Sequence, residues 1–134
     1  MRIKTIKLFA LCLFLITASV SMGQTITALW DFQNCNPSSL SGMSIQSTTG
    51  EVQSTVDGVV LKVDATDGKL AQRSSDAQFN TGTKLQVPVQ SANDIVTVVS
   101  YPNYHNYTVG GVAADADKTE HKATTADVRK AMLK

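Results

Sequence analysis

The amino-acid sequence predicts an all-β fold, a jelly-roll-like antiparallel β-sandwich. Short runs that alternate apolar and polar residues recur along the chain, as in strands with one buried face. Turn-forming residues separate these runs at Asn34 to Ser39, Thr48 to Gly50, Asp57-Gly58, Asp67-Gly68, Thr81-Gly82 and Gly110-Gly111. Short alternating strands with frequent turns are typical of sandwiches and barrels.

The first segment, residues 1–23, is predicted to be a secretory signal peptide. Its basic residues are Arg2, Lys4 and Lys7. They precede the apolar stretch 8–20, which is too short to span a bilayer comfortably. Small residues at Ser21 and Gly23 predict cleavage directly after Gly23. Residues 24–134 then form one secreted domain, periplasmic or extracellular, for which no transmembrane segment is expected.

The net charge and the cysteine content narrow the classes of function that the sequence allows. Loss of three basic residues with the leader leaves nine Lys and Arg against 11 Asp and Glu, so the formal net charge changes from +1 to −2. Such a chain has no basic excess to hold nucleic acid or an anionic membrane. Cys35 is then the single cysteine, so no internal disulfide can form, and we interpret it as a small buried hydrophobe.

Alternation places the strands of the remaining domain. The predicted strands span 25–32, 59–64, 84–89, 95–99 and 118–123. Pro88 cannot donate to a ladder, which predicts an edge or a bulge for the third strand. The stretch 95–99 is apolar on both faces, as expected of a central strand. His121 falls on the inward face of the last strand, where a structural histidine is the simpler interpretation. The predicted core includes Trp30, Leu61, Val63, Phe79, Val87 and Val98.

A short helical segment ends the chain. Thr124 or Thr125 can cap it, and Asp127 complements the positive end of the helix dipole. The chain ends four residues after Lys130. We therefore expect a sandwich that lacks its last strand and is incomplete at its C-terminal end.

An aromatic cluster supplies the main candidate site. The three tyrosines of the chain lie within seven residues, interleaved with a histidine and two amides: Tyr101, Asn103, Tyr104, His105, Asn106 and Tyr107. Flat amphipathic rings beside amide groups suit a sugar, because its C–H faces stack on the ring and its hydroxyls meet hydrogen-bond partners. The alternative is an aromatic plug at one end of the sandwich.

Arg73 and Asp76 are second candidates, because they are the charged residues of an otherwise small, uncharged loop. The Arg73 guanidinium could bind a uronate carboxylate as a bidentate fork. The alternative is an intramolecular ion pair between Arg73 and Asp76.

Two segments of the chain resemble a known family. They are Leu70 to Gly82, with Arg73-Ser74-Ser75-Asp76-Ala77-Gln78-Phe79-Asn80, and Val96 to Gly111, with Tyr101-Pro102 and Tyr104-His105-Asn106-Tyr107-Thr108-Val109-Gly110-Gly111. Trp30-Asp31-Phe32 and Val63 to Thr66 agree more weakly. The chain thereby resembles accessory β-sandwich domains found N-terminal to pectate-lyase-type catalytic domains in secreted polysaccharide-degrading proteins of Bacteroidetes. The resemblance implies a carbohydrate-binding module linked to the degradation of pectin-type polysaccharides.

The residues give little support for catalysis or for a bound cofactor. No motif places paired carboxylates or a nucleophile with its base, so no enzymatic activity is expected. No cofactor is expected either, although the oxygen-rich loops Asp64 to Gly68 and Asp115 to Asp117 leave a structural calcium ion open. The sequence therefore predicts a secreted, non-catalytic domain whose partner is a polysaccharide or oligosaccharide. The alternatives are an N-terminal fragment of a pectate-lyase-like enzyme and a structural spacer without a ligand.

Overall fold

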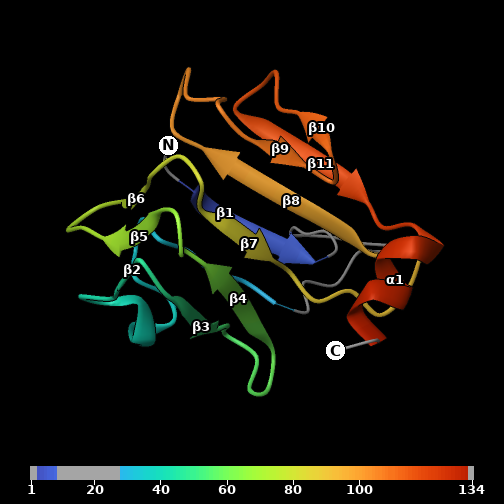
Figure 1. The fold of residues 1–134 in the computed structure, drawn as a ribbon, viewed down its shortest axis with the longest axis horizontal. Coiled ribbons are helices and arrows are strands. Elements are labelled where there is room, and N and C mark those ends of the chain that lie inside the picture. The colour runs from blue at the N-terminus through green and yellow to red at the C-terminus, as the bar shows by residue number, and fades with distance from the viewer. Residues whose placement is uncertain (1–2, 9–27, 133–134) are drawn as a thin grey trace.

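The computed structural model describes residues 3–8 and 28–132 and has an all-β architecture with one helix near its C-terminal end (Figure 1). The strands are β1 (Ile3–Leu8), β2 (Ser44–Gln46), β3 (Thr49–Gln53), β4 (Val60–Asp64), β5 (Lys69–Gln72), β6 (Ala77–Phe79), β7 (Lys84–Gln86), β8 (Ile95–Ser100), β9 (Thr108–Val109), β10 (Val112–Ala113) and β11 (Lys118–Lys122). The helical elements are η1 (Ser38–Leu40), a 3-10 turn, and α1 (Thr125–Met132).

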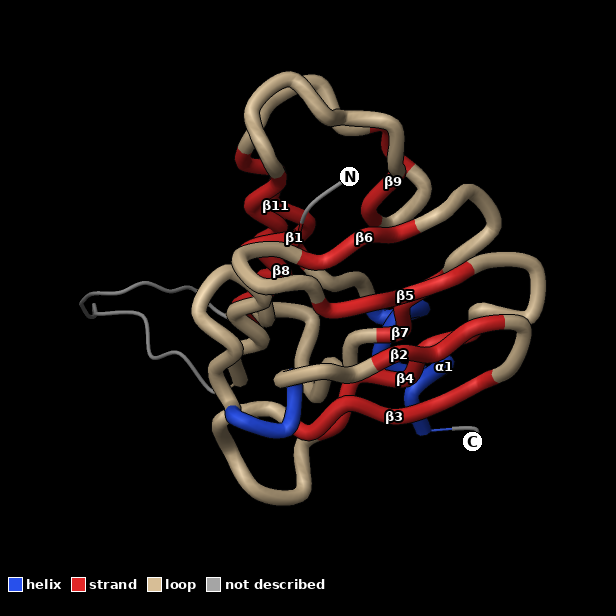
Figure 2. The backbone as a smooth tube through the Cα atoms, turned by 90° about the vertical axis from the view of Figure 1, so that its left-hand side faces the viewer, coloured by secondary structure: helices blue, strands red, loops and turns tan. Residues whose placement is uncertain are grey.

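The strands form antiparallel sheets in the orders β1-β8-β11, β2-β5-β6 and β3-β4-β7, with β9 and β10 as a separate hairpin. Figure 2 shows β2 to β7 running alongside one another, with β9 and β11 above them. The predicted fold class, an antiparallel β-sandwich, is confirmed. No helix among the described residues is long and apolar enough to cross a membrane.

One cluster of buried side chains joins the sheets. Five of the six predicted core residues belong to it, and Val87 is partly buried and packs against it. Trp30 is fully buried, and its Nε1 donates to the carbonyl of Val52 in β3 at 2.7 Å. Phe32 and Phe79 meet edge to face with ring centroids 5.6 Å apart. Cys35 is partly buried and also packs against this cluster, in agreement with its interpretation as a small hydrophobe.

Strand β8 is central, as its sequence predicts. It lies between β1 and β11, and Val96, Thr97 and Val98 are all buried, so both of its faces are covered. Strand β7 is an edge strand, as predicted, but it ends at Gln86 and so is shorter than the predicted range 84–89. In β11 the three charged residues are exposed, whereas Thr119 and His121 are partly buried.

Turn chemistry explains two of the hairpins. Gly58 has φ +82° between β3 and β4, where the Val59 amide donates to the Val56 carbonyl at 3.1 Å. Gly110 and Gly111 have φ +58° and +82° and form the two-residue turn between β9 and β10. Two successive positive φ angles define a type I′ turn, which favours glycine.

Several sequence predictions are corrected here. The stretch 28–32 is not a strand, although Ala28, Trp30 and Phe32 are buried as predicted; it contributes only an isolated bridge from Asp31 to Asn36. The predicted turn at Thr48 to Gly50 is wrong, because β3 begins at Thr49 and the turn precedes it at Ser47 (φ +56°). Strands β2, β3, β5, β6, β9 and β10 were not predicted.

The predicted signal peptide falls in two regions. Residues 3–8 form β1, which pairs with β8. The apolar stretch from residue 9 onward and the cleavage position lie outside the described residues. The signal peptide therefore stays a prediction.

The predicted cap of the C-terminal helix is confirmed. The Asp127 amide donates to Thr124 Oγ1 at 3.2 Å, and the Thr124 amide donates to Asp127 Oδ2 at 2.8 Å. This reciprocal pair is a capping box with aspartate at its third helical position. The helix continues to Met132, beyond the single turn that was expected.

Candidate functional site

A turn brings two tyrosines together after β8. The Tyr104 amide donates to the Tyr101 carbonyl at 3.0 Å, Pro102 occupies the second position, and Asn103 at the third has φ +65°. This is the pattern of a type II turn, for which proline and asparagine are suited at these positions. The two rings meet edge to face, with centroids 5.7 Å apart and planes at 81°.

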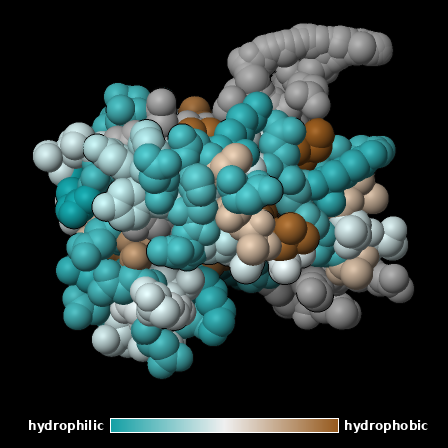
Figure 3. Space-filling model, turned by 90° about the horizontal axis from the view of Figure 1, so that it is seen from above, coloured by the Kyte–Doolittle hydropathy of each residue, from teal (hydrophilic) through white to brown (hydrophobic). Residues whose placement is uncertain are grey.

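Both rings of this pair are exposed, 44% for Tyr101 and 52% for Tyr104. Large aromatic side chains are ordinarily buried, so two exposed rings in contact are informative. The cluster is therefore not a buried plug as a whole. Seen from above, the molecule's surface is mostly hydrophilic and broken by a few hydrophobic side chains (Figure 3).

Asp117 fixes the loop that carries these rings. Its Oδ1 accepts hydrogen bonds from His105 Nε2 at 2.6 Å and from the Asn103 amide at 3.0 Å. Its backbone carbonyl accepts the Ser100 amide at 2.8 Å, at the end of β8. The hydrogen bonds from His105 and Asn103 lower the pKa of the Asp117 carboxyl, because they stabilise its charged form. Asp117 thus anchors the loop from Tyr101 to Tyr107 through Ser100, which precedes the turn, and through Asn103 and His105.

A cleft of about 820 Å³ opens beside the loop, between β7 on one side and β8, β9 and β11 on the other. Its apolar lining comprises Phe79, Leu85, Val87, Val89, Val96, Val98, Val109 and Ala123. Its polar lining includes Asn80, Lys84, Tyr104, Asn106, Tyr107, His121 and Asp127. Ligand sites typically have this size and this mixture of apolar walls with a few polar groups.

Tyr107 joins the cleft to the core. Its ring is partly buried and packs against the core cluster, and its amide and carbonyl bond to the His105 carbonyl and the Ala114 amide. Its hydroxyl is buried without a hydrogen-bond partner among the described residues. Buried hydroxyls normally have partners, so this one is an unsatisfied polar group at the boundary between the cleft and the core.

His121 and Asp127 form a hydrogen-bonded pair in the cleft wall. Asp127 Oδ2 accepts from His121 Nε2 at 3.0 Å, and both side chains are partly buried. The bond from His121, the Thr124 amide and the Thr124 hydroxyl lower the pKa of Asp127 to about 2. A carboxylate at this pKa only accepts hydrogen bonds, so His121 Nε2 carries the proton. Gly110 packs so closely on the His121 ring that a Cβ there would overlap it.

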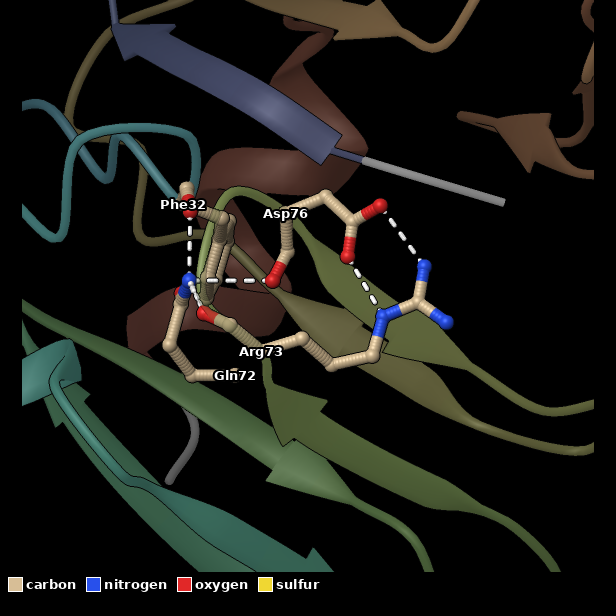
Figure 4. A network of polar contacts seen from close by, with 4 residues as sticks. All are labelled: Phe32, Gln72, Arg73 and Asp76. Atoms are coloured by element: carbon tan, nitrogen blue, oxygen red, sulfur yellow. Dashed lines mark hydrogen bonds and ion pairs between the residues drawn. The ribbon is translucent and has the colours of Figure 1, made fainter.

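The second candidates, Arg73 and Asp76, form an intramolecular ion pair. This pair is the alternative to ligand binding that the sequence left open. Arg73 Nε and Nη2 donate to the two Asp76 carboxylate oxygens at 2.5 and 2.6 Å across the turn between β5 and β6 (Figure 4). The pair raises the pKa of Arg73. Neither residue lines the cleft. The guanidinium is therefore committed to an intramolecular pair rather than presented to a ligand.

The Gln72 side chain holds the turn between β5 and β6 through hydrogen bonds. Its Nε2 donates to the carbonyls of Phe32, Arg73 and Asp76 at 2.6, 2.7 and 2.9 Å (Figure 4). These contacts tie the β5–β6 turn to the stretch around Phe32.

A second hollow, of about 740 Å³, is shallow and lined mainly by polar turn residues, among them Thr66, Asp67 and Asn80. It contains none of the predicted site residues. The neighbouring Asp64 carboxylate accepts the Thr66 amide at 3.0 Å, which together with the Thr66 hydroxyl lowers its pKa. Within residues 3–8 and 28–132, no three His, Cys, Asp or Glu side chains are grouped as a metal site would require.

The structure thus brings Tyr104, Asn106 and Tyr107 to the cleft, and the Tyr101 ring meets Tyr104 edge to face. Asn103 and His105 position the loop through Asp117. The sequence interpretation missed His121 and Asp127 as cleft residues. The alternation that placed His121 inward and the helix cap at Asp127 were the signals that could have paired them.

Comparisons of the chain with protein-family models, with curated proteins and with solved structures find no match.

Proposed function

We propose that this chain is a secreted, non-catalytic accessory domain that binds a polysaccharide or oligosaccharide. The exposed edge-to-face pair of Tyr101 and Tyr104 beside the cleft is the observation that carries this proposal. A sugar ring placed against one tyrosine keeps its C–H face on the aromatic ring, while its hydroxyls reach polar groups at the edge. Asn106 also lines this cleft and offers an amide group of this kind.

The rigidity of the loop supports binding. Asp117 holds Asn103 and His105, and the turn between Tyr101 and Tyr104 closes with its own hydrogen bond. A loop that is ordered before the ligand arrives loses less conformational entropy on binding. An exposed aromatic pair held in this way fits a recognition surface better than an incidental surface feature.

The charges of the residues around the cleft favour a neutral region of a glycan as the ligand. Arg73 is engaged by Asp76, and Asp127 places a negative charge in the cleft wall. Lys84 is the cation of the cleft lining. A link to pectin-type polysaccharides and secretion after cleavage at Gly23 rest on the resemblance and on the predicted leader. The chain's role in polysaccharide degradation is that of attachment to the substrate.

Binding without cleavage accords with the composition of the cleft. Asp127 is the one carboxylate in the part of its lining that the structure describes, and it is bonded to His121. Glycoside hydrolysis ordinarily uses two carboxyl groups, one on each side of the scissile bond. The cleft therefore fits a binding role.

A glycan array with the secreted protein tests the proposal, followed by titration of the best ligand into single variants. Tyr101→Ala and Tyr104→Ala should each weaken binding about 2- to 13-fold, because an aromatic contact contributes about 0.5–1.5 kcal/mol. The melting temperature should change little, because both rings are exposed. Val112→Ala, which removes an exposed apolar side chain from β10, is the matched control.

Two results would reject this function. The first is the absence of binding to any plant, bacterial or algal glycan on an array that is validated with known binders. The second is binding that both tyrosine variants and the Val112 control retain equally.

A further inference from the structure

Strand β8 is covered on one edge by a segment that the sequence predicts to be removed. β1 pairs antiparallel with β8, with Thr5, Ile6, Lys7 and Leu8 opposite Val99, Val98, Thr97 and Val96. On its other edge β8 pairs with β11 over five residues. The ladder with β1 therefore covers one edge of β8 from Val96 to Ser100, with an irregular register between Ile3 and Thr5.

The composition of β8 is that of an interior strand. Ile95 to Ser100 contains no charged residue and no proline, and Val96, Thr97 and Val98 are buried. Natural edge strands are protected from pairing by lysine, proline, bulges or covering segments. Strand β11 carries Lys118, Glu120 and Lys122 on its exposed positions. β8 has no such protection of its own and depends on its neighbours.

Removal of the leader would leave β8 with β11 as its sole strand neighbour within the described part of the chain. Backbone groups that lose their partners in a mostly buried strand cost free energy until another strand replaces them. This step rests on the secretion and processing in the proposed function. The loss of the β1 partner does not depend on whether the chain binds a glycan.

We propose that, after removal of residues 1–23, β8 pairs antiparallel with β8 of a second copy of this chain. An antiparallel pair of identical edges is related by a two-fold axis perpendicular to the sheet, which keeps the core-facing side of both strands on the same side. The rows that contain Val96 and Val98 therefore remain continuous across the axis. The result is one sheet in the order β11-β8-β8-β11.

A second copy fits this edge for three reasons. The antiparallel direction is the one in which β8 already receives β1. The edge is uncharged, so that two copies oppose no like charges on β8 itself. The pairing is also closed, since each copy uses its single free β8 edge and leaves none for a third chain.

The test compares two forms of the full-length gene product. Cell-free synthesis gives the chain with residues 1–23, and secretion from a bacterial host gives the processed chain, whose first residue is identified by mass spectrometry. Sedimentation velocity in the presence of a reductant, which prevents linkage through Cys35, should give the mass of one chain for the first form and of two for the second.

Two further measurements assign the dimer to β8. Val99→Lys, at a partly buried position of β8, should raise the dissociation constant of the processed dimer about tenfold or more, since it places a positive charge on the pairing strand of both copies. Val112→Lys, on β10, is the matched control and should leave it unchanged. A peptide with the sequence of residues 3–8 in large excess should convert dimer to monomer, whereas its Thr5→Pro form should not.

Any of the following outcomes would overturn the proposal. A processed chain that is monomeric or forms open-ended assemblies contradicts closed pairing, and a secreted chain that keeps residues 1–23 keeps β8 covered. A dimer that resists both the peptide and a folded Val99→Lys variant uses a different surface. A glycan array that stays blank leaves this result untouched, so the two proposals fail separately.

Discussion

Asp127 connects the C-terminal helix to β11, and its removal gives a prediction with a defined pH dependence. Its carboxylate accepts His121 Nε2 at 3.0 Å, the Thr124 amide at 2.8 Å and the Thr124 hydroxyl at 3.0 Å. These bonds lower its pKa from 3.8 to about 2. Asp127→Asn removes the charge while it retains an acceptor for the cap.

The magnitude follows from this pKa. A fall from 3.8 to about 2 would correspond to about 2.5 kcal/mol of stability if it were fully realised, at about 1.36 kcal/mol per pH unit. The Asp127 side chain is 29% exposed, so solvent screening reduces the expected contribution to about 1–2 kcal/mol. A depressed pKa stabilises the fold above the unfolded value, and this stabilisation is lost as the pH falls through about 2.

Urea unfolding at pH 7 and near pH 2 measures this contribution. The free energy of unfolding of Asp127→Asn should lie about 1–2 kcal/mol below that of the wild type at pH 7, and the gap should narrow by at least half near pH 2. Asp57→Asn, in the exposed β3–β4 turn, is the control for general loss of charge. A gap that stays the same at both pH values would refute the reasoning, because the stability would then not come from the ionised carboxylate.

Three further substitutions test other parts of the structure by urea unfolding. Leu61→Ala should cost about 2–5 kcal/mol, since Leu61 is fully buried, and a loss below about 0.5 kcal/mol would contradict its core position. Tyr107→Phe should leave stability unchanged or slightly higher, because it removes a buried hydroxyl that has no partner among the described residues; a loss above about 1 kcal/mol would indicate a bonded hydroxyl. Gly110→Ala should cost more than Gly111→Ala, because both have positive φ but only a Cβ at Gly110 meets the His121 ring; equal losses would argue against that contact.

Much of the fold could be predicted from alternation and turn chemistry. β8 and β11 are long enough for their side-chain pattern to identify them, and Pro88 marks an edge because proline cannot donate to a ladder. Strands β2 and β6 have only three residues each, which is too short for a period of two to emerge. The strand expected at 25–32 is not formed over its described part, 28–32, for another reason: burial of Trp30 and Phe32 produces alternation without a paired strand.

The candidate site could be predicted only in part. The tyrosines stand out in the sequence, and Pro102-Asn103 between two of them marks a turn. The bond from His105 to Asp117 spans 12 residues, and the sheet register that brings these residues together cannot be inferred from local pattern. For Arg73 and Asp76, three residues apart, the sequence allowed both a ligand site and an ion pair, and the turn geometry selects the pair.

The most direct test of the central claim is the affinity of the Tyr101→Ala/Tyr104→Ala double variant for the glycan that the wild-type protein binds, measured by titration calorimetry. The account predicts a loss of about 5- to 150-fold, the product of two aromatic contacts, with an unchanged melting temperature and with normal affinity in the Val112→Ala control. Wild-type affinity in the double variant would contradict the account, because the exposed tyrosine pair would then have no part in binding.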